Sequence, residues 1–327
     1  MAELVDAHDS KSCVERHESS ILSPGTPMKK EKLIVILGPT SGGKTALSIH
    51  LAKKYNGEII SADSRQVYRG MNLGTGKVTK KEMAGVAHHL LDVAEPKKQF
   101  SISGYTALAE KAIADIFSRG KIPIICGGTG FYIDTLVNGI ILPEVPPNVT
   151  LRKKLTGKSA SVLFKQLQKL DPARAKTIEK ENPVRLIRAI EIATALGKVP
   201  KIEKKPVPYQ ILKIGLDMPD DVLKARINER LKMRIKAGML REAKMLHAKG
   251  LSFVRMRELG LEYRAMANLL TNKITREQFE RELALVIWRY AKRQRVWFKR
   301  DTAIAWYNPL KKLDIKKIES LVKKFIV

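Results

Sequence analysis

The feature that most constrains this chain is a glycine-rich loop directly after a hydrophobic segment. Residues 33–37 are all hydrophobic and mostly β-branched, which is typical of a strand buried on both faces of a parallel sheet. Residues 38–45 read GPTSGGKT and match the P-loop template, and hydrophobic residues then recur at helical spacing over 46–52. The alternative, an ordinary strand-turn-helix, leaves this combination unexplained, so we predict a phosphate-binding loop.

The loop carries the groups that hold a di- or triphosphate. Backbone N–H groups of the glycine turn and the positive end of the next helix attract an anion, Lys44 adds a full charge, and the Thr45 hydroxyl can ligate Mg²⁺. Mg²⁺ is the only cofactor we expect. The predicted diphosphate-binding residues are Gly38, Thr40, Ser41, Gly42, Gly43, Lys44 and Thr45.

Composition limits the classes of partner. A hydrophobic content of 44% fits a globular protein of 327 residues, and no hydrophobic run approaches the roughly 18 residues of a membrane span. A formal charge of +28 favours a polyanionic partner, with nucleic acid first, although a solvated lysine-rich surface is the alternative. Cys13 and Cys126 suggest neither a disulfide framework nor a metal cluster, so we expect a cytoplasmic protein.

The first 31 residues are polar and aperiodic, which predicts a disordered tail without a signal peptide. Residues 18–23 can be encoded by a T-arm-like hairpin and residues 9–12 by an anticodon-loop-like stretch. One hypothesis is therefore that this tail is a translated tRNA gene and that the natural start is Met28.

Two further segments bring polar groups to the expected carboxyl edge of the sheet. A strand over 58–62 delivers Asp63, and a strand over 122–126 leads into a glycine turn with Thr129. Asp63 is a candidate for catalysis, with a helix N-cap as the alternative role. No acidic residue ends the second strand, which argues against a standard ATP hydrolase.

The remaining chain divides into an insert and a returning core. We predict an α/β fold of the P-loop NTPase type, a parallel sheet flanked by helices, with its core in residues 32–142 and 206–327. Proline-flanked, basic, helical residues 143–205 form an inserted all-helical domain, in which Arg185 and Arg188 share a helix face that suits phosphates. The pair His88 and His89 points in different directions, so a structural role is the default.

Two helices of the returning core carry basic residues. Arg226, Arg230 and Arg234 recur every fourth residue and are predicted to form a phosphate clamp. Residues 276–299 form a last long helix, whose end interleaves basic residues with Trp288, Trp297 and Phe298. That pattern suits RNA contact, but packing into the core is the alternative for most of these aromatic residues.

Several motifs in series resemble the tRNA dimethylallyltransferases, also called tRNA isopentenylpyrophosphate transferases. They are GPTSGGKT, DSRQVYRGMNLGTGK, HHLLDV, GGTGFY, NPVRLIRAIEI and YAKRQRVWF, and the resemblance runs from about residue 32 to the carboxyl end. The loop differs from the usual family pattern at Ser41-Gly42, as do Gly76-Lys77-Val78 and residues 259–264. tRNA contacts around 257–264 are therefore not carried over.

The resemblance implies transfer of a dimethylallyl group from dimethylallyl diphosphate to N6 of the adenosine 3′ of the anticodon, with release of diphosphate. It implies that Asp63 is the base, that Thr129 and Arg230 are catalytic at the diphosphate, and that Ser64, Arg65 and Gln66 help to hold a flipped base. The implied tRNA contacts are Asp63, Ser64, Arg65, Gln66, Arg185 and Arg188. We expect a monomer whose partners are the anticodon stem-loop of tRNA and dimethylallyl diphosphate.

Two other interpretations stay open at this point. A P-loop nucleoside or small-molecule kinase would use the same loop to bind ATP. A basic RNA-binding module with a vestigial loop would explain the charge without any reaction.

Overall fold

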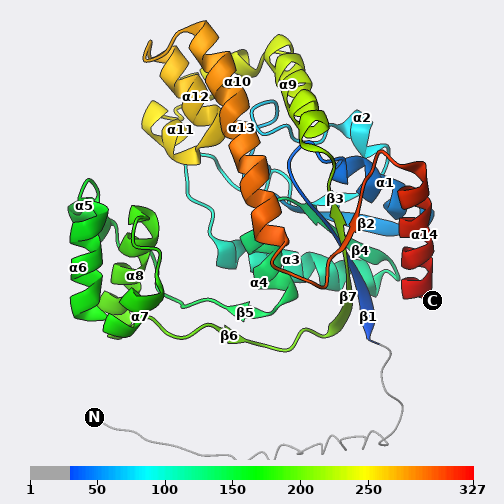
Figure 1. The fold of residues 1–327 in the computed structure, drawn as a ribbon, viewed down its shortest axis with the longest axis horizontal. Coiled ribbons are helices and arrows are strands. Elements are labelled where there is room, and N and C mark those ends of the chain that lie inside the picture. The colour runs from blue at the N-terminus through cyan, green and yellow to red at the C-terminus, as the bar shows by residue number, and fades with distance from the viewer. Residues whose placement is uncertain (1–29) are drawn as a thin grey trace, which may run out of the picture. The chain divides into compact units, whose positions relative to one another are not determined.

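A six-stranded parallel sheet organises the part of the chain that the computed structural model describes, residues 30–327 (Figure 1). The strand order is β3-β2-β4-β1-β7-β8, with the strand of the P-loop, β1, in the interior. The bounds are Glu31–Leu37 for β1, Gly57–Ala62 for β2, His88–His89 for β3, Ile122–Gly127 for β4, Tyr209–Leu216 for β7 and Ala305–Tyr307 for β8. The predicted α/β class with a parallel P-loop-like sheet is confirmed.

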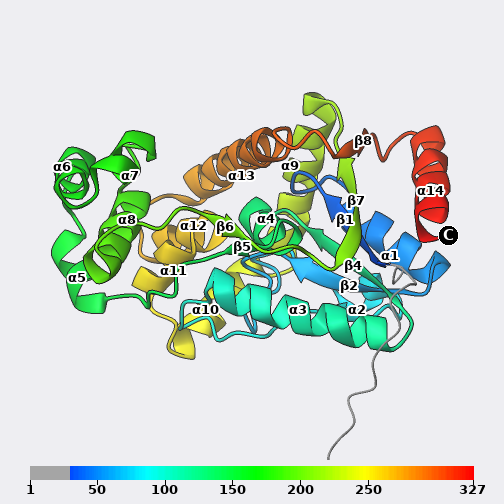
Figure 2. The same ribbon diagram turned by 90° about the horizontal axis from the view of Figure 1, so that it is seen from below.

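Helices cover both faces of the sheet because β1 is hydrophobic on both. Ile34 and Ile36 face α1 (Lys44–Lys54) and α14 (Lys312–Ile326), and Leu33, Val35 and Leu37 face α3 (Ile102–Ser118) and α4 (Gly130–Val137). Figure 2 shows α3 alongside the strands. The five side chains from Leu33 to Leu37 of β1 are at most 1% exposed, as a strand between two helical layers requires.

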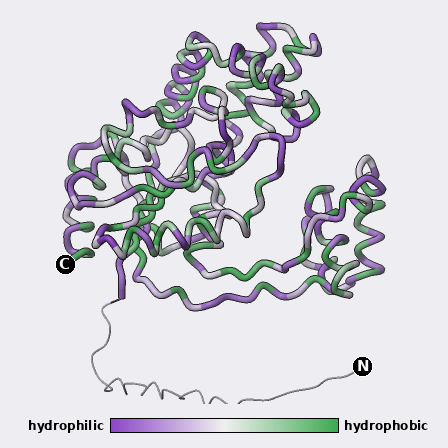
Figure 3. The backbone as a smooth tube through the Cα atoms, turned by 180° about the vertical axis from the view of Figure 1, so that it is seen from behind, coloured by the Kyte–Doolittle hydropathy of each residue, from purple (hydrophilic) through white to green (hydrophobic). Residues whose placement is uncertain are grey.

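A second group of helices builds a core of its own. It contains α9 (Asp220–Lys236), α10 (Met239–Ala248), α11 (Phe253–Leu259), α12 (Leu261–Leu270) and α13 (Arg276–Phe298), and the loop residues Tyr68 and Met71 pack into it. Hydrophilic and hydrophobic residues are mixed along these helices (Figure 3), as expected for helices with one buried side. The short helix α2 covers Lys80–Met83.

Four helices follow within the range predicted as an insert. They are α5 (Val149–Leu155), α6 (Ala160–Leu170), α7 (Pro172–Thr177) and α8 (Pro183–Leu196), and they share a separate hydrophobic cluster around Leu163, Leu167 and Leu186. The expectation of an all-helical insert is wrong at one end, because β6 (Glu203–Lys204) pairs antiparallel with β5 (Ile140–Ile141). The two short strands form the connection between insert and core, and the domain boundary itself stays a prediction.

Some sequence expectations concern the edges of the described region. The disordered tail and the start at Met28 fall on residues 1–29, outside the described residues, whereas Glu31 belongs to β1 rather than to the tail. Among residues 30–327, no helix is both long and hydrophobic enough to cross a membrane, and no cluster of three metal-ligating side chains occurs.

The buried carboxylate of Glu191 joins α8 to the start of α5. It accepts hydrogen bonds from the Asn148 N–H at 2.6 Å and from Arg152 at 2.9 Å, and it pairs with Arg188. Glu191→Ala would leave these donors without their acceptor, at a cost of about 1–3 kcal/mol. We expect amide hydrogen exchange in α5 and α8 to accelerate about 10-fold or more, while exchange in β1 stays unchanged; equal exchange in variant and wild type would contradict this role.

Candidate active site

The carboxyl ends of three neighbouring strands are in register. Leu37 of β1 pairs with Gly127 of β4, which also pairs with Ala62 of β2. The P-loop, Asp63 and the turn that contains Thr129 therefore leave the sheet side by side. This is the edge at which open α/β sheets bind ligands, and it brings together groups about 90 residues apart in the chain, the separation of Thr40 and Thr129.

The backbone of the P-loop explains two of its glycines. Gly38 has a φ of 141°, and a Cβ there would lie 2.3 Å from the carbonyl oxygen of Leu216 on the adjacent strand. Gly43 caps α1 with a φ of 87°, in the left-handed region. The amino group of Lys44, the first residue of α1, donates to the Pro39 carbonyl at 2.7 Å, so Lys44 closes over the loop.

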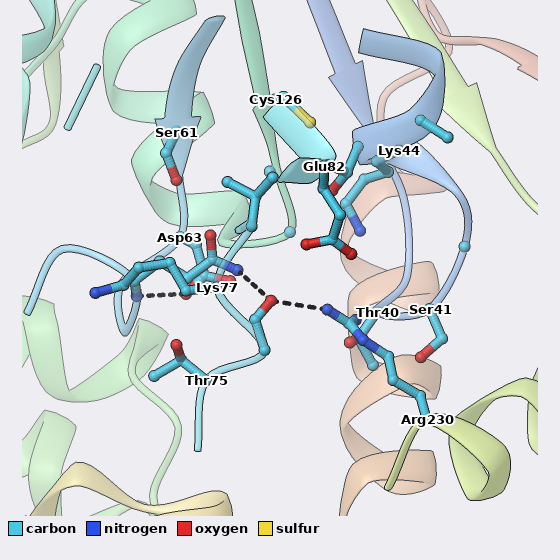
Figure 4. Close-up of a pocket in the computed structure, with 18 of the residues that line it drawn as sticks. Thr40, Ser41, Lys44, Ser61, Asp63, Thr75, Lys77, Glu82, Cys126 and Arg230 are labelled. Atoms are coloured by element: carbon cyan, nitrogen blue, oxygen red, sulfur yellow. Dashed lines mark hydrogen bonds between the residues drawn. The ribbon is translucent and has the colours of Figure 1, made fainter. Parts of the chain in front are cut away.

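A cavity of about 700 Å³ lies at this edge of the sheet. The P-loop, the residues after β2, loop 72–79, α9 and α13 all contribute to its wall. Figure 4 shows Lys44, Asp63 and Arg230 around the same hollow, with Arg230 entering from α9. The remaining predicted residues that line it include Thr40, Ser41, Gly42, Gly43, Thr45 and Gln66.

Two desolvated cations make this cavity suited to an anion. Burial lowers the pKa of Lys44 to about 8; the charges of Cys126 and Asp63 oppose this shift, and that of Arg230 adds to it. Burial, with the nearby charge of Arg234, also lowers the pKa of Arg230. Because each cation would gain from a negative charge between them, the cavity is suited to a polyphosphate.

Asp63 caps a turn and still faces the cavity. Its Oδ1 accepts the N–H groups of Arg65 at 2.8 Å and Gln66 at 3.2 Å. These bonds close a turn and no helix begins here, so the alternative role as a helix N-cap is wrong. No described residue hydrogen-bonds Oδ2, which leaves that oxygen for a ligand. Thr129 is adjacent: its Oγ1 accepts the Ser64 N–H at 3.0 Å.

The three arginines of α9 line the cavity but have different partners. Arg230 donates to the Gly76 carbonyl at 2.8 Å. Arg234 donates hydrogen bonds to the carbonyls of Leu73 and Gly74 and to Glu262. Its guanidinium is therefore already occupied in this structure, and the prediction that all three arginines form a phosphate clamp is wrong for Arg234. Arg226 remains at the cavity wall.

Among the other predicted residues, His88 lines this cavity, whereas Arg185, Arg188, His89, Trp297 and Phe298 do not. Arg185 pairs with Glu179 at 2.8 Å, and Arg188 pairs with Glu191 and donates to the Val145 carbonyl at 2.8 Å. Their contact with tRNA stays a prediction. His88 and His89 hydrogen-bond the Val86 carbonyl and Glu58, in line with their expected structural role. Phe298 is buried and Trp297 donates to Asp134, as core packing requires.

Sequence reasoning missed residues that meet the loops from α13. Gln294 is buried, accepts the Thr40 N–H of the P-loop at 2.8 Å and donates to the Gly128 carbonyl at 2.8 Å. One turn earlier, Tyr290 lies beside Thr129 and Asp63, and burial raises its pKa to about 12. Their spacing of four residues on one helix was the available signal, hidden among the basic and aromatic residues around it.

The fold and the cavity define a P-loop protein whose cavity is suited to a polyphosphate and lies next to a carboxylate. Comparison with known proteins narrows this class: the family model described as IPP transferase matches residues 66–301. The chain belongs to the IPP transferase family.

Similar sequences and similar solved structures agree with this family assignment. The tRNA dimethylallyltransferase of Halothermothrix orenii is 40% identical over 301 residues, 89% of this chain and 92% of that protein. The full-length tRNA isopentenylpyrophosphate transferase of Bacillus halodurans has a TM-score of 0.69 at 36% identity, over 90% of this chain and 97% of that one. A eukaryotic dimethylallyltransferase acting on tRNA has a TM-score of 0.74 at 26% identity, over 90% and 79%.

The lowered pKa of Lys44 predicts proton uptake when an anion binds. At pH 8.5 a large share of Lys44 is neutral, and pyrophosphate should draw it back to the charged form. Calorimetric titration with pyrophosphate in buffers of different ionisation enthalpy should therefore show more proton uptake for the wild type than for Lys44→Arg, whose charge does not titrate. Above pH 8 the wild-type affinity should fall by up to about tenfold per pH unit relative to Lys44→Arg. Identical proton uptake by the wild type and Lys44→Arg would contradict a lowered pKa of Lys44 at the anion site.

Proposed function

We propose that this chain transfers a dimethylallyl group from dimethylallyl diphosphate to N6 of the adenosine 3′ of the anticodon in tRNA. The observation that carries the proposal is the pairing of two desolvated cations with the carboxylate of Asp63 at one cavity. The family to which the chain belongs supports prenyl transfer, and its relatives are named for tRNA. We also propose that the catalytic unit is a monomer.

The P-loop would hold the leaving group. An allylic diphosphate ionises once the negative charge on the departing oxygen is stabilised, and Lys44 of α1 and Arg230 of α9 would stabilise it. Thr129 would contact the same diphosphate from the turn after β4. When the C1–O bond breaks, its electron pair leaves with diphosphate.

Asp63 would act on the nucleophile. The free Oδ2 would accept a proton from the adenine amine while the new N6–C1 bond forms, which balances the loss of diphosphate. The hydrogen bonds to Oδ1 hold the carboxylate in one orientation. Ser64, Arg65 and Gln66 continue the same turn and would hold the flipped base.

The basic surface suits the tRNA backbone. On α13, the exposed residues Arg289, Lys292 and Arg293 extend from the turn that carries Tyr290. The insert adds further arginines, among them Arg185, which is more than half exposed. The net charge of +28 supports phosphate neutralisation over a long anticodon stem.

Asp63→Asn separates the two roles of this side chain. Asparagine keeps an Oδ1 acceptor for the N–H groups of Arg65 and Gln66 but cannot take the proton. We expect kcat for prenylation of an anticodon stem-loop to fall by about 10²–10⁴-fold, with tRNA affinity unchanged. Mass spectrometry of the RNA product measures the rate of prenylation, and filter binding measures the tRNA affinity.

The same assay tests the alternatives. Phosphate transfer from labelled ATP without prenylation by the wild type would favour a kinase, and unchanged activity of Asp63→Asn would remove Asp63 from the reaction. An RNA-binding module alone would bind the stem-loop and leave its mass unchanged.

We also propose that Mg²⁺ binds with the diphosphate at Thr45. The hydroxyl lies in the first turn of α1, at the exposed mouth of the cavity, and fits the ligand position next to Lys44. β4 ends at Gly127 without a carboxylate that could bind Mg²⁺. The chain would therefore supply the Thr45 hydroxyl as a ligand, and oxygens of the substrate would supply other ligands. Bound Mg²⁺ would neutralise part of the diphosphate charge.

Replacement of Thr45 tests this ligand. Thr45→Val removes the hydroxyl at nearly constant volume, and we expect the Mg²⁺ concentration for half-maximal pyrophosphate binding to rise about tenfold or more. Thr45→Ser keeps the hydroxyl and should stay near wild type. A Val variant with the Mg²⁺ dependence of the Ser variant would exclude the hydroxyl as a ligand.

A further inference from the structure

A buried carboxylate outside the reaction site binds three consecutive backbone N–H groups. Glu242 lies in α10 and is 7% exposed. Its Oε2 accepts the N–H groups of Asn72 at 2.9 Å and Leu73 at 2.7 Å, and its Oε1 accepts that of Gly74 at 2.8 Å. The Tyr263 hydroxyl of α12 donates to Oε1 at 2.7 Å. Four donors on one carboxylate fix it strongly.

The loop that Glu242 holds has no regular structure of its own, but it forms part of the cavity wall. Its N–H groups meet Glu242, while its carbonyls face α9. The Gly76 carbonyl accepts from Arg230 at 2.8 Å, and the only other side chain bound to that carbonyl among the described residues is Gln66, at 3.4 Å. Figure 4 shows these bonds reaching one oxygen between Arg230 and the Asp63 side of the cavity.

The glycines of the loop show how closely these parts fit. A Cβ on Gly74 would lie 2.6 Å from the Tyr263 ring, and a Cβ on Gly76 would lie 2.6 Å from a guanidinium nitrogen of Arg230. A side chain at either position would therefore clash with Tyr263 or with Arg230 unless that residue moved. Residue 74 must be small for Glu242 and Tyr263 to reach the backbone.

We propose that Glu242 is a positioning residue for the reaction, because it anchors loop 72–76 and through the Gly76 carbonyl sets the direction of the Arg230 guanidinium at the diphosphate site. This inference rests on the proposed function for the identity of the anion. Gly76 O is the one hydrogen-bond acceptor of Arg230 among the described residues, so the long side chain depends on the loop for its orientation. A displacement of about 1 Å in such a group can cost about 10²-fold in rate.

Glu242→Gln is the direct test, because it keeps the size of the side chain and replaces one acceptor oxygen by a donor facing N–H groups. We expect kcat for prenylation to fall about 10–100-fold and the affinity for pyrophosphate, measured by calorimetry, to fall about tenfold. The matched control is Glu58→Gln. Glu58 is also a buried carboxylate, 4% exposed, bound by Arg119, Lys121 and His89, but it lies at the amino end of β2. This control should lower thermal stability and leave pyrophosphate affinity unchanged.

A double-mutant cycle separates positioning from general destabilisation. In an Arg230→Ala background, Glu242→Gln should change pyrophosphate affinity by less than about twofold, because its effect acts through the arginine. If Glu242→Gln does not fold, Tyr263→Phe removes one of the four donors and should show a smaller loss with the same dependence on Arg230. Equal losses with and without Arg230, or an unchanged affinity in Glu242→Gln, would overturn the inference.

The pyrophosphate measurement also separates this inference from the proposed function. It needs no prenyl transfer, so coupling between Glu242 and Arg230 remains measurable whatever the acceptor is. A wild type that shows this coupling but leaves the stem-loop unmodified would overturn the proposed function and retain the positioning role.

Discussion

The structure depends on holding two desolvated cations, Lys44 and Arg230, at one cavity. A positive charge removed from water is unfavourable without a partner, and burial lowers the pKa of both groups. The charge of Arg230 lowers the pKa of Lys44 further, and the charge of Arg234 lowers that of Arg230. Each is therefore tied to a backbone carbonyl, of Pro39 for Lys44 and of Gly76 for Arg230. An anion bound beside them would favour the charged form of both side chains.

Several contacts fix the two loops that carry these carbonyls. The P-loop is held by its own glycine geometry and by Gln294, which connects it to the turn after β4. Loop 72–76 is held by Glu242 on one side and by Arg234 on the other. The helices α9, α10 and α13 thus act as a rigid frame for three loops at the edge of a sheet, as precise catalytic geometry requires.

The sequence predicted those parts of the site that are local. The P-loop, the strand before it and the helix after it follow from 20 consecutive residues, 33–52, and parallel strands necessarily bring Asp63 and Thr129 to the same edge. The regular spacing on α9 identified Arg230. The same spacing predicted that Arg234 also binds phosphate. That prediction is wrong because the Arg234 guanidinium donates its hydrogen bonds to the carbonyls of Leu73 and Gly74.

What the sequence by itself determined is the α/β class, the phosphate loop and the order of the motifs, because buried strands and glycine turns depend on neighbours in the chain. Only the tertiary structure decided which polar side chains support the site. Gln294 and Thr40 are 254 positions apart, and Glu242 and Asn72 are 170 apart, so no periodicity links them. Both residues occur in helices where a Glu or Gln normally points to water, and only packing against the loops turns them inward, where backbone groups must find partners.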